Sequence, residues 1–378
     1  MRAIIDGLYS EYLDFLEDVC NIESGSRDKQ GVDAVADYIA DFARKSGYKV
    51  ERKVFDTAGD CLLVDWVCDE KKPFIVLSAH MDTVFEKGAF GYPRVRRDDE
   101  FIYGPGVCDC KGGVAMAFLV VAALKKMDFC GCNIRVLLQS DEEVSSSLSG
   151  GETIKYICDR ARGCKAFFNL EPKYPGKLTL ERGGILHAKF TVIGKAAHSS
   201  AKEKGANAIS EAALKIGDII SREPDSGISF NCGVINGGSA SNIVPEKCEF
   251  HVEARAWENE NYEKAKLIFA EIAEKQFIEG TKTTFEMVSE RIPMAFAEFN
   301  LELLKKINEI NEKHGFDALA PRKSLGGSDA SYTTAAGIPT ADGMGMIGYN
   351  LHSVEEKAVK RSLADGAEHL ATIILELC

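Results

Sequence analysis

Five short segments, far apart along the chain, carry imidazole and carboxylate side chains of the kind that hold divalent metal ions. The candidates are His80, Asp109, one member of the pair Glu142 and Glu143, Glu171 and His352. Zinc-like ions bind imidazole nitrogens and carboxylate oxygens, and two ions about 3.5 to 4 Å apart can share one carboxylate and one water. Five ligands that include one shared carboxylate satisfy such a pair of ions, so the sequence favours a two-metal hydrolytic centre.

Apolar segments precede three of these candidates. Residues 74–79 are predicted to form a buried strand that ends at His80. Residues 134–140 are predicted to form a second strand that ends in a run of three acids, and residues 166–170 a third that ends at Glu171. In an open α/β sheet, ligands bind in the crevice at the carboxyl ends of the strands, so we expect these side chains to converge there.

Each segment has a simpler explanation when it is considered alone. His80 could be a buried histidine whose ring is satisfied by Asp82, two residues further along. Asp109 could cap the helix predicted over residues 114–124, and His352 could lie by chance in a glycine-rich loop. A run of acids usually faces water. The metal interpretation is favoured because all of the segments occur together.

The acidic run Asp141-Glu142-Glu143 suggests two different roles for neighbouring carboxylates. One carboxylate would bind a metal ion, while its neighbour would take a proton from the attacking water. The residues alone do not decide which glutamate has which role. A metal-bound imidazole usually donates its second ring N–H to a carboxylate, and Asp82 is placed to receive that hydrogen bond from His80.

These motifs resemble the aminoacylase and carboxypeptidase superfamily of two-zinc peptidases, and within it the bacterial glutamate carboxypeptidases. They occur in the family's order from about Leu13 to the C-terminus. The resemblance is carried by residues 80–88 (HMDTVFEKG), 103–113, 141–143, 170–172, 194–199 (GKAAHS), 241–245 (SNIVP) and 326–331 (GGSDAS).

The resemblance implies a role for each residue of the centre. His80 and Glu171 would hold one zinc ion and Glu143 and His352 the other, with Asp109 bridging both, Glu142 acting as general base and acid, and Asp82 orienting His80. Cobalt or manganese could replace zinc. The resemblance also implies a cis peptide between Asp109 and Cys110, where Cys110 stands in place of the usual acidic residue.

Three polar residues lie outside these segments, and each could be an ordinary surface group. His198 could be a loop histidine, Asn242 a capping residue and Arg255 a member of a surface ion pair. In the family that the chain resembles, the residue matching His198 polarises the scissile carbonyl, often from the partner subunit. Those matching Asn242 and Arg255 bind the substrate's carbonyl or carboxylate. Arginine suits this role because it can clamp a carboxylate with two parallel hydrogen bonds.

A chain of 378 residues exceeds the usual size of a single core, so two domains are expected. Alternating apolar and polar residues over 185–193 and 246–256 indicate half-buried antiparallel strands. A helix is predicted between them at residues 206–220, and a second helix and a third strand follow at residues 262–277 and 283–288. This order suits a small α+β layer inserted into a larger α/β domain. The family resemblance implies the same arrangement, an α/β, three-layer, zinc-peptidase (phosphorylase/hydrolase-like) catalytic domain of residues 1–182 and 293–378. It also implies that the insert at residues 183–292 is an α+β ferredoxin-like lid and dimerisation domain.

The net charge of -12 argues against a nucleic-acid-binding protein, which needs a basic footprint. No apolar run reaches the roughly 20 residues that span a bilayer. Acidic residues come too early in the N-terminal segment for a secretory signal, so we expect a cytoplasmic protein. Its twelve cysteines are therefore expected to be reduced thiols, and the alternate-residue pairs Cys108/Cys110 and Cys130/Cys132 lack the usual spacing of a structural zinc site.

The predicted function is two-metal hydrolysis of an amide next to a free carboxylate, in small peptides or acyl amino acids, by a homodimer. One alternative is a deacylase of N-acyl amino acids. Another is a protein that binds peptides without catalysis on a peptidase scaffold, which the presence of Glu142 and a complete ligand set disfavours.

Overall fold

The computed structural model describes residues 1–223 and 227–378, and these fall into two compact units. The main unit consists of Met1–Leu180, Phe296–Lys323 and Ser328–Cys378. The inserted unit consists of Glu181–Ala295 and Ser324–Gly327. Each unit has a hydrophobic core of its own.

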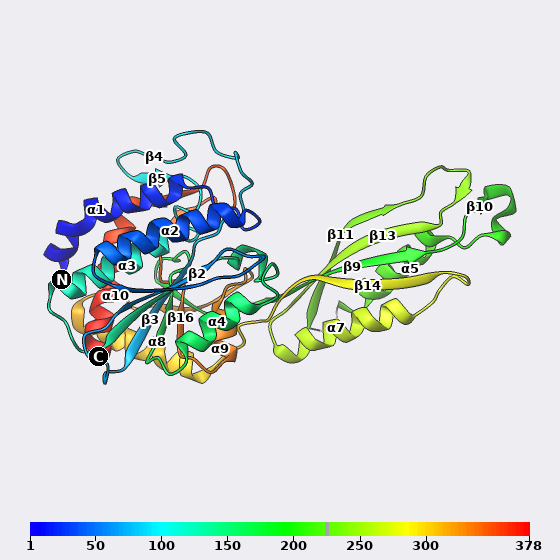
Figure 1. The fold of residues 1–378 in the computed structure, drawn as a ribbon. Coiled ribbons are helices and arrows are strands. Elements are labelled where there is room, and N and C mark those ends of the chain that lie inside the picture. Colours follow the sequence, from blue (N-terminus) through cyan, green and yellow to red (C-terminus); the bar gives the residue numbers. More distant parts are fainter. Residues whose placement is uncertain (224–226) are drawn as a thin grey trace. The chain divides into compact units, whose positions relative to one another are not determined.

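The main unit is built on an eight-stranded mixed sheet with the order β1-β2-β6-β3-β7-β16-β8-β15 (Figure 1). Its centre is parallel, because β3 runs parallel to β6 and β7, and β7 parallel to β16. The strands are β1 (Lys49–Lys53), β2 (Cys61–Trp66), β3 (Phe74–His80), β6 (Asn133–Gln139), β7 (Phe167–Asn169), β8 (Lys177–Arg182), β15 (Ala320–Ser324) and β16 (Thr340–Asp342). A small sheet of the order β17-β18-β5-β4 comprises Gly348–Tyr349, Lys357–Val359, Phe101–Tyr103 and Arg96–Arg97.

Helices cover both faces of the large sheet. Successive side chains of β3 point to opposite faces of the sheet, and both faces are buried. Ile75 and Leu77 belong to one buried hydrophobic cluster and Val76 belongs to another. Helices α1, α2 and α3 lie on the first face, and α4 and α9 on the second (Figure 1). The helices are α1 (Arg2–Asn21), α2 (Lys29–Lys45), α3 (Lys111–Lys126), α4 (Glu152–Ala161), α8 (Glu298–His314), α9 (Ala330–Ala335) and α10 (Lys360–Leu377). The predicted three-layer α/β fold is confirmed.

The inserted unit has the chain order strand, helix, strand, strand, helix, strand. These elements are β9 (Gly184–Ile193), α5 (Ala208–Ser221), β11 (Ile228–Gly237), β13 (Lys247–Ala256), α7 (Asn259–Glu274) and β14 (Lys282–Arg291). The four strands form an antiparallel sheet of the order β11-β13-β9-β14. This is the ferredoxin-like arrangement, as predicted. Two short strands, β10 (Ala197–His198) and β12 (Ile243–Val244), pair separately.

Strand β11 is absent from the sequence-based prediction. Only the residues near its beginning are buried, while its second half is exposed and contains glycine and asparagine. The strand lies at the edge of its sheet, where one row of backbone groups has no neighbouring strand. Apolar and polar residues alternate from Ile228 to Val234, but Ile235 breaks this period beside a register shift between Cys232 and Val234.

The expectation that all cysteines are free thiols is wrong for one pair. Cys132 and Cys378 form a disulfide across 246 positions of sequence, a pairing for which the sequence has no local pattern. The other ten cysteines are free. Within the described ranges, no group of potential metal ligands contains more than one cysteine.

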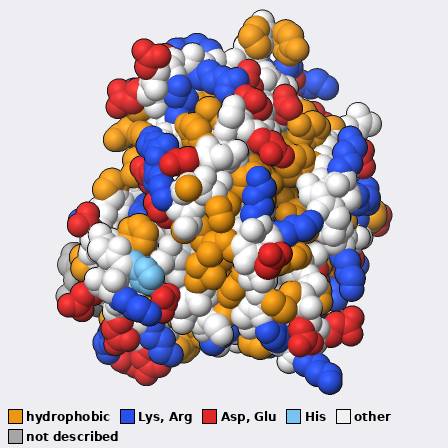
Figure 2. Space-filling model, turned by 90° about the vertical axis from the view of Figure 1, so that its left-hand side faces the viewer, with side chains coloured by type: hydrophobic (Ala, Val, Ile, Leu, Met, Phe, Trp, Pro, Cys, Tyr) orange, Lys and Arg blue, Asp and Glu red, His pale blue; other side chains and the backbone are white. Residues whose placement is uncertain are grey.

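Charged side chains of both signs are interspersed over the face of the molecule in Figure 2, with hydrophobic side chains between them. That face carries no continuous basic stripe of the kind that binds nucleic acid. None of the helices in the described ranges is both long and apolar enough to cross a bilayer.

A buried histidine makes stability depend on pH. His369 of α10 is 5% exposed, and its Nε2 lies 2.7 Å from Asn311 Oδ1 of α8. Burial, with a smaller effect of the Lys173 charge, lowers the pKa of His369 to about 3. In the unfolded chain the imidazole titrates near 6.5, so below that pH only the unfolded state gains the proton. Stability is therefore lost as the pH falls from about 6.5 toward 3.

We expect His369→Gln to remove this part of the pH dependence. Between pH 7.5 and 5.5, the wild type should lose about 1.4 kcal/mol more unfolding free energy than the variant. Urea unfolding at the two pH values measures the difference. His314→Gln, which changes an exposed histidine of α8, is the control and should follow the wild type. Equal slopes for His369→Gln and wild type would contradict the assignment.

Candidate metal centre

The five predicted ligands lie together at the carboxyl ends of the central strands of the main unit. His80 is the last residue of β3, and Glu171 follows β7 by two residues. The His80 Nε2 atom lies 3.7 Å from Glu171 Oε1 and 3.2 Å from Asp109 Oδ1. His352 Nε2 lies 3.2 Å from Glu143 Oε2. Segments that are far apart in sequence thus form one cluster of ligand atoms.

Asp109 lies between the two histidines. Its Oδ1 is 3.2 Å from His80 Nε2, and its Oδ2 is 3.2 Å from His352 Nε2. The carboxylate therefore presents one oxygen to each half of the cluster, which is the geometry expected of a shared ligand. The peptide bond between Asp109 and Cys110 is cis, as the family resemblance implies.

Asp82 anchors both the histidine and the acidic turn. Its Oδ1 lies 3.3 Å from His80 Nδ1, whose nearer neighbour is the Asp82 main-chain oxygen at 3.0 Å. The same carboxylate accepts backbone N–H groups of Glu142 and Glu143, both at 3.1 Å, and the Ser26 hydroxyl at 2.7 Å. Asp82 can thus fix the His80 ring and the position of both glutamates at once.

The two glutamates of the turn differ in their surroundings. Glu143 Oε2 lies 3.2 Å from His352 Nε2, whereas Glu142 Oε2 lies 4.0 Å from His80 Nε2. Both residues belong to a short 3-10 turn, Glu142–Val144, directly after β6. The difference favours Glu143 as the ligand and leaves Glu142 beside the cluster, where it could exchange a proton with water.

The imidazoles and carboxylates of the cluster shift one another's pKa values. Burial lowers the pKa of His80, but neighbouring groups, among them Asp109 and Asp82, raise it well above its usual value. Hydrogen bonds to Asp109 and Glu143 raise the pKa of His352 to about 11. Burial opposes ionisation of Asp109, yet the two histidines hold its pKa below the usual range. Burial and the Asp109 charge raise the pKa of Glu143.

This donor set fits two divalent ions. Imidazoles that bind metal are neutral, so the four carboxylates of the cluster leave four negative charges uncompensated. Two divalent cations would balance this charge, and the nitrogen and oxygen donors are those that zinc prefers, with cobalt and manganese as alternatives. The carboxylates of the cluster are those of Asp109, Glu142, Glu143 and Glu171.

Glu356 is a residue of the centre that the sequence reasoning missed. Its buried carboxylate accepts three backbone N–H groups, those of Gly106 at 3.1 Å, Cys108 at 2.9 Å and Asp109 at 3.1 Å. Burial and the nearby Asp109 charge raise the pKa of Glu356 to about 7. Only its position four residues after His352, in a run of charged residues, could have drawn attention to it. Glu356 fixes the loop that carries Asp109.

We expect Glu356→Gln to loosen that loop. An amide has one acceptor oxygen where the carboxylate has two, so at least one buried N–H loses its partner, at a cost of about 1 to 3 kcal/mol. Metal affinity should fall by about 10- to 100-fold, as it does when groups that orient ligands are changed. Thermal unfolding and zinc competition titrations measure the two effects. Glu355→Gln, at the adjacent exposed glutamate, is the matched control, and equal behaviour of the two variants would contradict the role.

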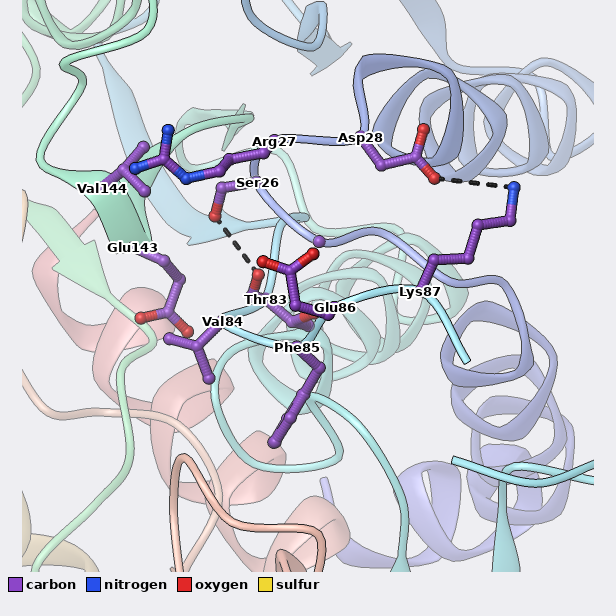
Figure 3. Close-up of a pocket in the computed structure, with 11 residues that line it drawn as sticks. Ser26, Arg27, Asp28, Thr83, Val84, Phe85, Glu86, Lys87, Glu143 and Val144 are labelled. Atoms are coloured by element: carbon purple, nitrogen blue, oxygen red, sulfur yellow. Dashed lines mark hydrogen bonds and ion pairs between the residues drawn. The ribbon is translucent and has the colours of Figure 1, made fainter. Parts of the chain in front are cut away.

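A pocket of about 370 Å³ adjoins the cluster at Glu143 (Figure 3). The segment before α2 and the segment after β3 provide most of its wall. Val84 and Phe85 contribute apolar surface, and Arg27 extends toward Val144. A group of a bound substrate could therefore find apolar contacts and a guanidinium beside the metal cluster.

The three predicted substrate-binding residues belong to the inserted unit. His198 ends β10, its Nδ1 lies 2.8 Å from Ser200 Oγ, and the next residue donates its N–H to the Asn242 carbonyl at 2.9 Å. His198 and Asn242 are thus neighbours. Arg255 lies on β13 and binds Glu253 through Nε at 2.6 Å. Its guanidinium also donates to the Leu325 carbonyl at 2.7 Å.

Comparison with known proteins gives a consistent result. Residues 76–376 match the family described as peptidase family M20/M25/M40. The chain is 27% identical over 365 residues to carboxypeptidase G2 of Pseudomonas sp. (strain RS-16), covering 92% of this chain and 86% of that protein. It is also 27% identical over 348 residues to a succinyl-diaminopimelate desuccinylase of Methylobacterium radiotolerans, covering 85% and 86% of the two chains.

Solved structures share the fold. Aminopeptidase PepT from Bacillus cereus superposes with a TM-score of 0.78 at 23% identity, covering 98% of each chain. A dinuclear metal-binding peptidase of the M20 family from Bacillus subtilis superposes with a TM-score of 0.71 at 14% identity, again covering 98% of each chain. Both superpositions extend over the main and the inserted unit.

Proposed function

Because the chain belongs to peptidase family M20/M25/M40 and is therefore a metal-dependent amide hydrolase, we propose that it cleaves an amide bond next to a free carboxylate in small peptides or acyl amino acids. The observation that carries the proposal is the position of Asp109, whose two oxygens each meet one histidine at 3.2 Å. The name of the similar carboxypeptidase G2 supports a substrate with a terminal carboxylate.

In this proposal the ligands are His80, Asp109, Glu143, Glu171 and His352. Two divalent ions held by these residues, zinc by preference, would supply Lewis acidity and lower the pKa of a bound water. The Glu142 carboxylate would take a proton from the attacking water and later pass it to the leaving amine. Asp82 keeps the His80 ring in place throughout.

Residues 183–292 would act as a lid and as the contact of a homodimer, in a cytoplasmic enzyme. Within the lid, His198 would polarise the scissile carbonyl, and Asn242 and Arg255 would bind the substrate's carbonyl or carboxylate. Arg255 is held by Glu253, so substrate binding would require the guanidinium to share or exchange that partner.

Matched substrates test the proposal. Each dipeptide, N-acetyl amino acid and folate-like glutamate is assayed with added zinc, cobalt or manganese, beside an analogue whose terminal carboxylate is a carboxamide. We expect kcat/KM to fall by about 30-fold or more for the carboxamides, since leaving one partner of a charged pair unpaired costs about 2 kcal/mol or more. Hydrolysis of both forms at similar rates would refute the carboxylate requirement.

The same panel separates a peptidase from a deacylase. The succinyl-diaminopimelate desuccinylases among the similar proteins favour a deacylase as the second candidate, because they remove an acyl group. Faster turnover of N-acetyl amino acids than of dipeptides would select it. Activity on none of the substrates, with two ions bound, would favour a protein that binds peptides without catalysis.

A further inference from the structure

A sulfur atom lies beside the candidate metal centre. Cys110 follows Asp109 directly and is completely buried. Its Sγ, a ring nitrogen of His80 and a carboxylate oxygen of Glu171 all lie within 4.8 Å of one another. His80 Nε2 and Glu171 Oε1 are themselves 3.7 Å apart. The three atoms are therefore close enough to surround a single ion.

The position of the thiol is specific to Cys110. The thiol donates to the Leu170 carbonyl at 3.0 Å, and Leu170 immediately precedes Glu171, so the sulfur lies on the Glu171 side of the centre. Cys108 is equally buried and only two residues away, but its Sγ lies 3.5 Å from the Met346 carbonyl. Among the described residues, Cys108 belongs to neither of the groups that could hold an ion.

We infer that Cys110 is a ligand of the ion held by His80 and Glu171, in a centre of nitrogen, oxygen and sulfur donors. This inference rests on the proposed metal centre. When the ion binds, the Sγ–H bond breaks, the proton leaves to solvent and a sulfur electron pair forms the bond to the ion. No electron is transferred, so no oxidant is needed.

The geometry requires only a small movement. With zinc bonds of about 2.0 to 2.3 Å in a tetrahedral arrangement, ligand atoms lie about 3.3 to 3.8 Å apart. Side-chain shifts of about 1 Å or less would therefore close the group. A thiolate is a soft ligand, so Cys110 would make the site on the His80 side prefer zinc or cobalt to manganese. The other ion, between Glu143 and His352, would keep nitrogen and oxygen donors.

Cobalt spectroscopy of the metal-free full-length chain tests the inference. We expect the wild type to show the near-ultraviolet sulfur-to-cobalt charge-transfer band. The band should reach its full intensity when the site on the His80 side is filled, and filling the other site should not increase it. Cys110→Ser should lose this band and keep the visible cobalt bands, while Cys108→Ser, the matched buried control, should keep both. Zinc competition should show an affinity about 10- to 100-fold weaker at one site of Cys110→Ser.

The outcomes distinguish this inference from the proposed centre. Visible cobalt bands without a charge-transfer band in the wild type overturn the sulfur ligand and leave the two-metal centre standing. A band that persists in Cys110→Ser also overturns it, because another thiol must then be responsible. Failure to bind cobalt overturns both. If Cys110→Ser does not fold, as judged by circular dichroism, Cys110→Ala replaces it, and a charge-transfer band that persists in Cys110→Ala overturns the inference.

Discussion

Glu142→Gln is expected to retain both metal ions and to lose turnover by about 10²- to 10⁴-fold, the usual contribution of a general acid–base group. The glutamine is close in size to the glutamate, and its backbone N–H can still donate to Asp82. An amide, however, accepts no proton from water at neutral pH. The loss should therefore appear in kcat, with KM nearly unchanged.

Steady-state kinetics and metal analysis of the purified variant measure the two expectations. Glu152→Gln, at an exposed glutamate of the nearby helix α4, is the control and should have wild-type kinetics. Near wild-type turnover of Glu142→Gln with two ions bound would exclude the general-base role. Loss of one ion would instead indicate that Glu142 is a ligand, which would reverse the roles of the two glutamates.

The strands that deliver the centre could be predicted because buried parallel strands have continuous apolar sequences. Residues 74–79 and 166–170 carry such runs, and the structure has β3 and β7 there. The residue that ends each run, or follows it, then lies at the same edge of the sheet. For that reason alone, the sequence predicts that His80 and Glu171 lie close together in space.

Other features depend on contacts that leave no local pattern. Glu356 was missed because its role consists of three hydrogen bonds to a loop about 250 positions earlier. Ser26, whose hydroxyl binds Asp82, was missed for the same reason. The pairing of Cys132 with Cys378 likewise joins distant residues. A single sequence gives the type and order of the ligands, whereas the groups that hold them in place are a property of the folded chain.

Asp109→Asn is expected to weaken binding of both ions and to lower kcat/KM by about 10³-fold or more, since bound ions contribute several kcal/mol to the transition state. The reason is geometric, because one oxygen of this carboxylate lies 3.2 Å from His80 Nε2 and the other lies 3.2 Å from His352 Nε2. Asparagine has the same shape but only one acceptor oxygen, so one of the two contacts becomes an N–H group facing an ion. Glu171, by contrast, has its Oε1 3.7 Å from His80 Nε2 and is proposed to hold the ion on that side.

Zinc titrations of Asp109→Asn and Glu171→Gln therefore form a matched pair, because both remove one charge and preserve shape. Asp109→Asn should weaken two binding steps, whereas Glu171→Gln should weaken one step and leave the other near the wild-type value. Equal effects of the two substitutions on both steps would mean that Asp109 is not the shared ligand. Two strong sites in Asp109→Asn would refute a bridged pair altogether, because ions that share no carboxylate would bind independently of this residue.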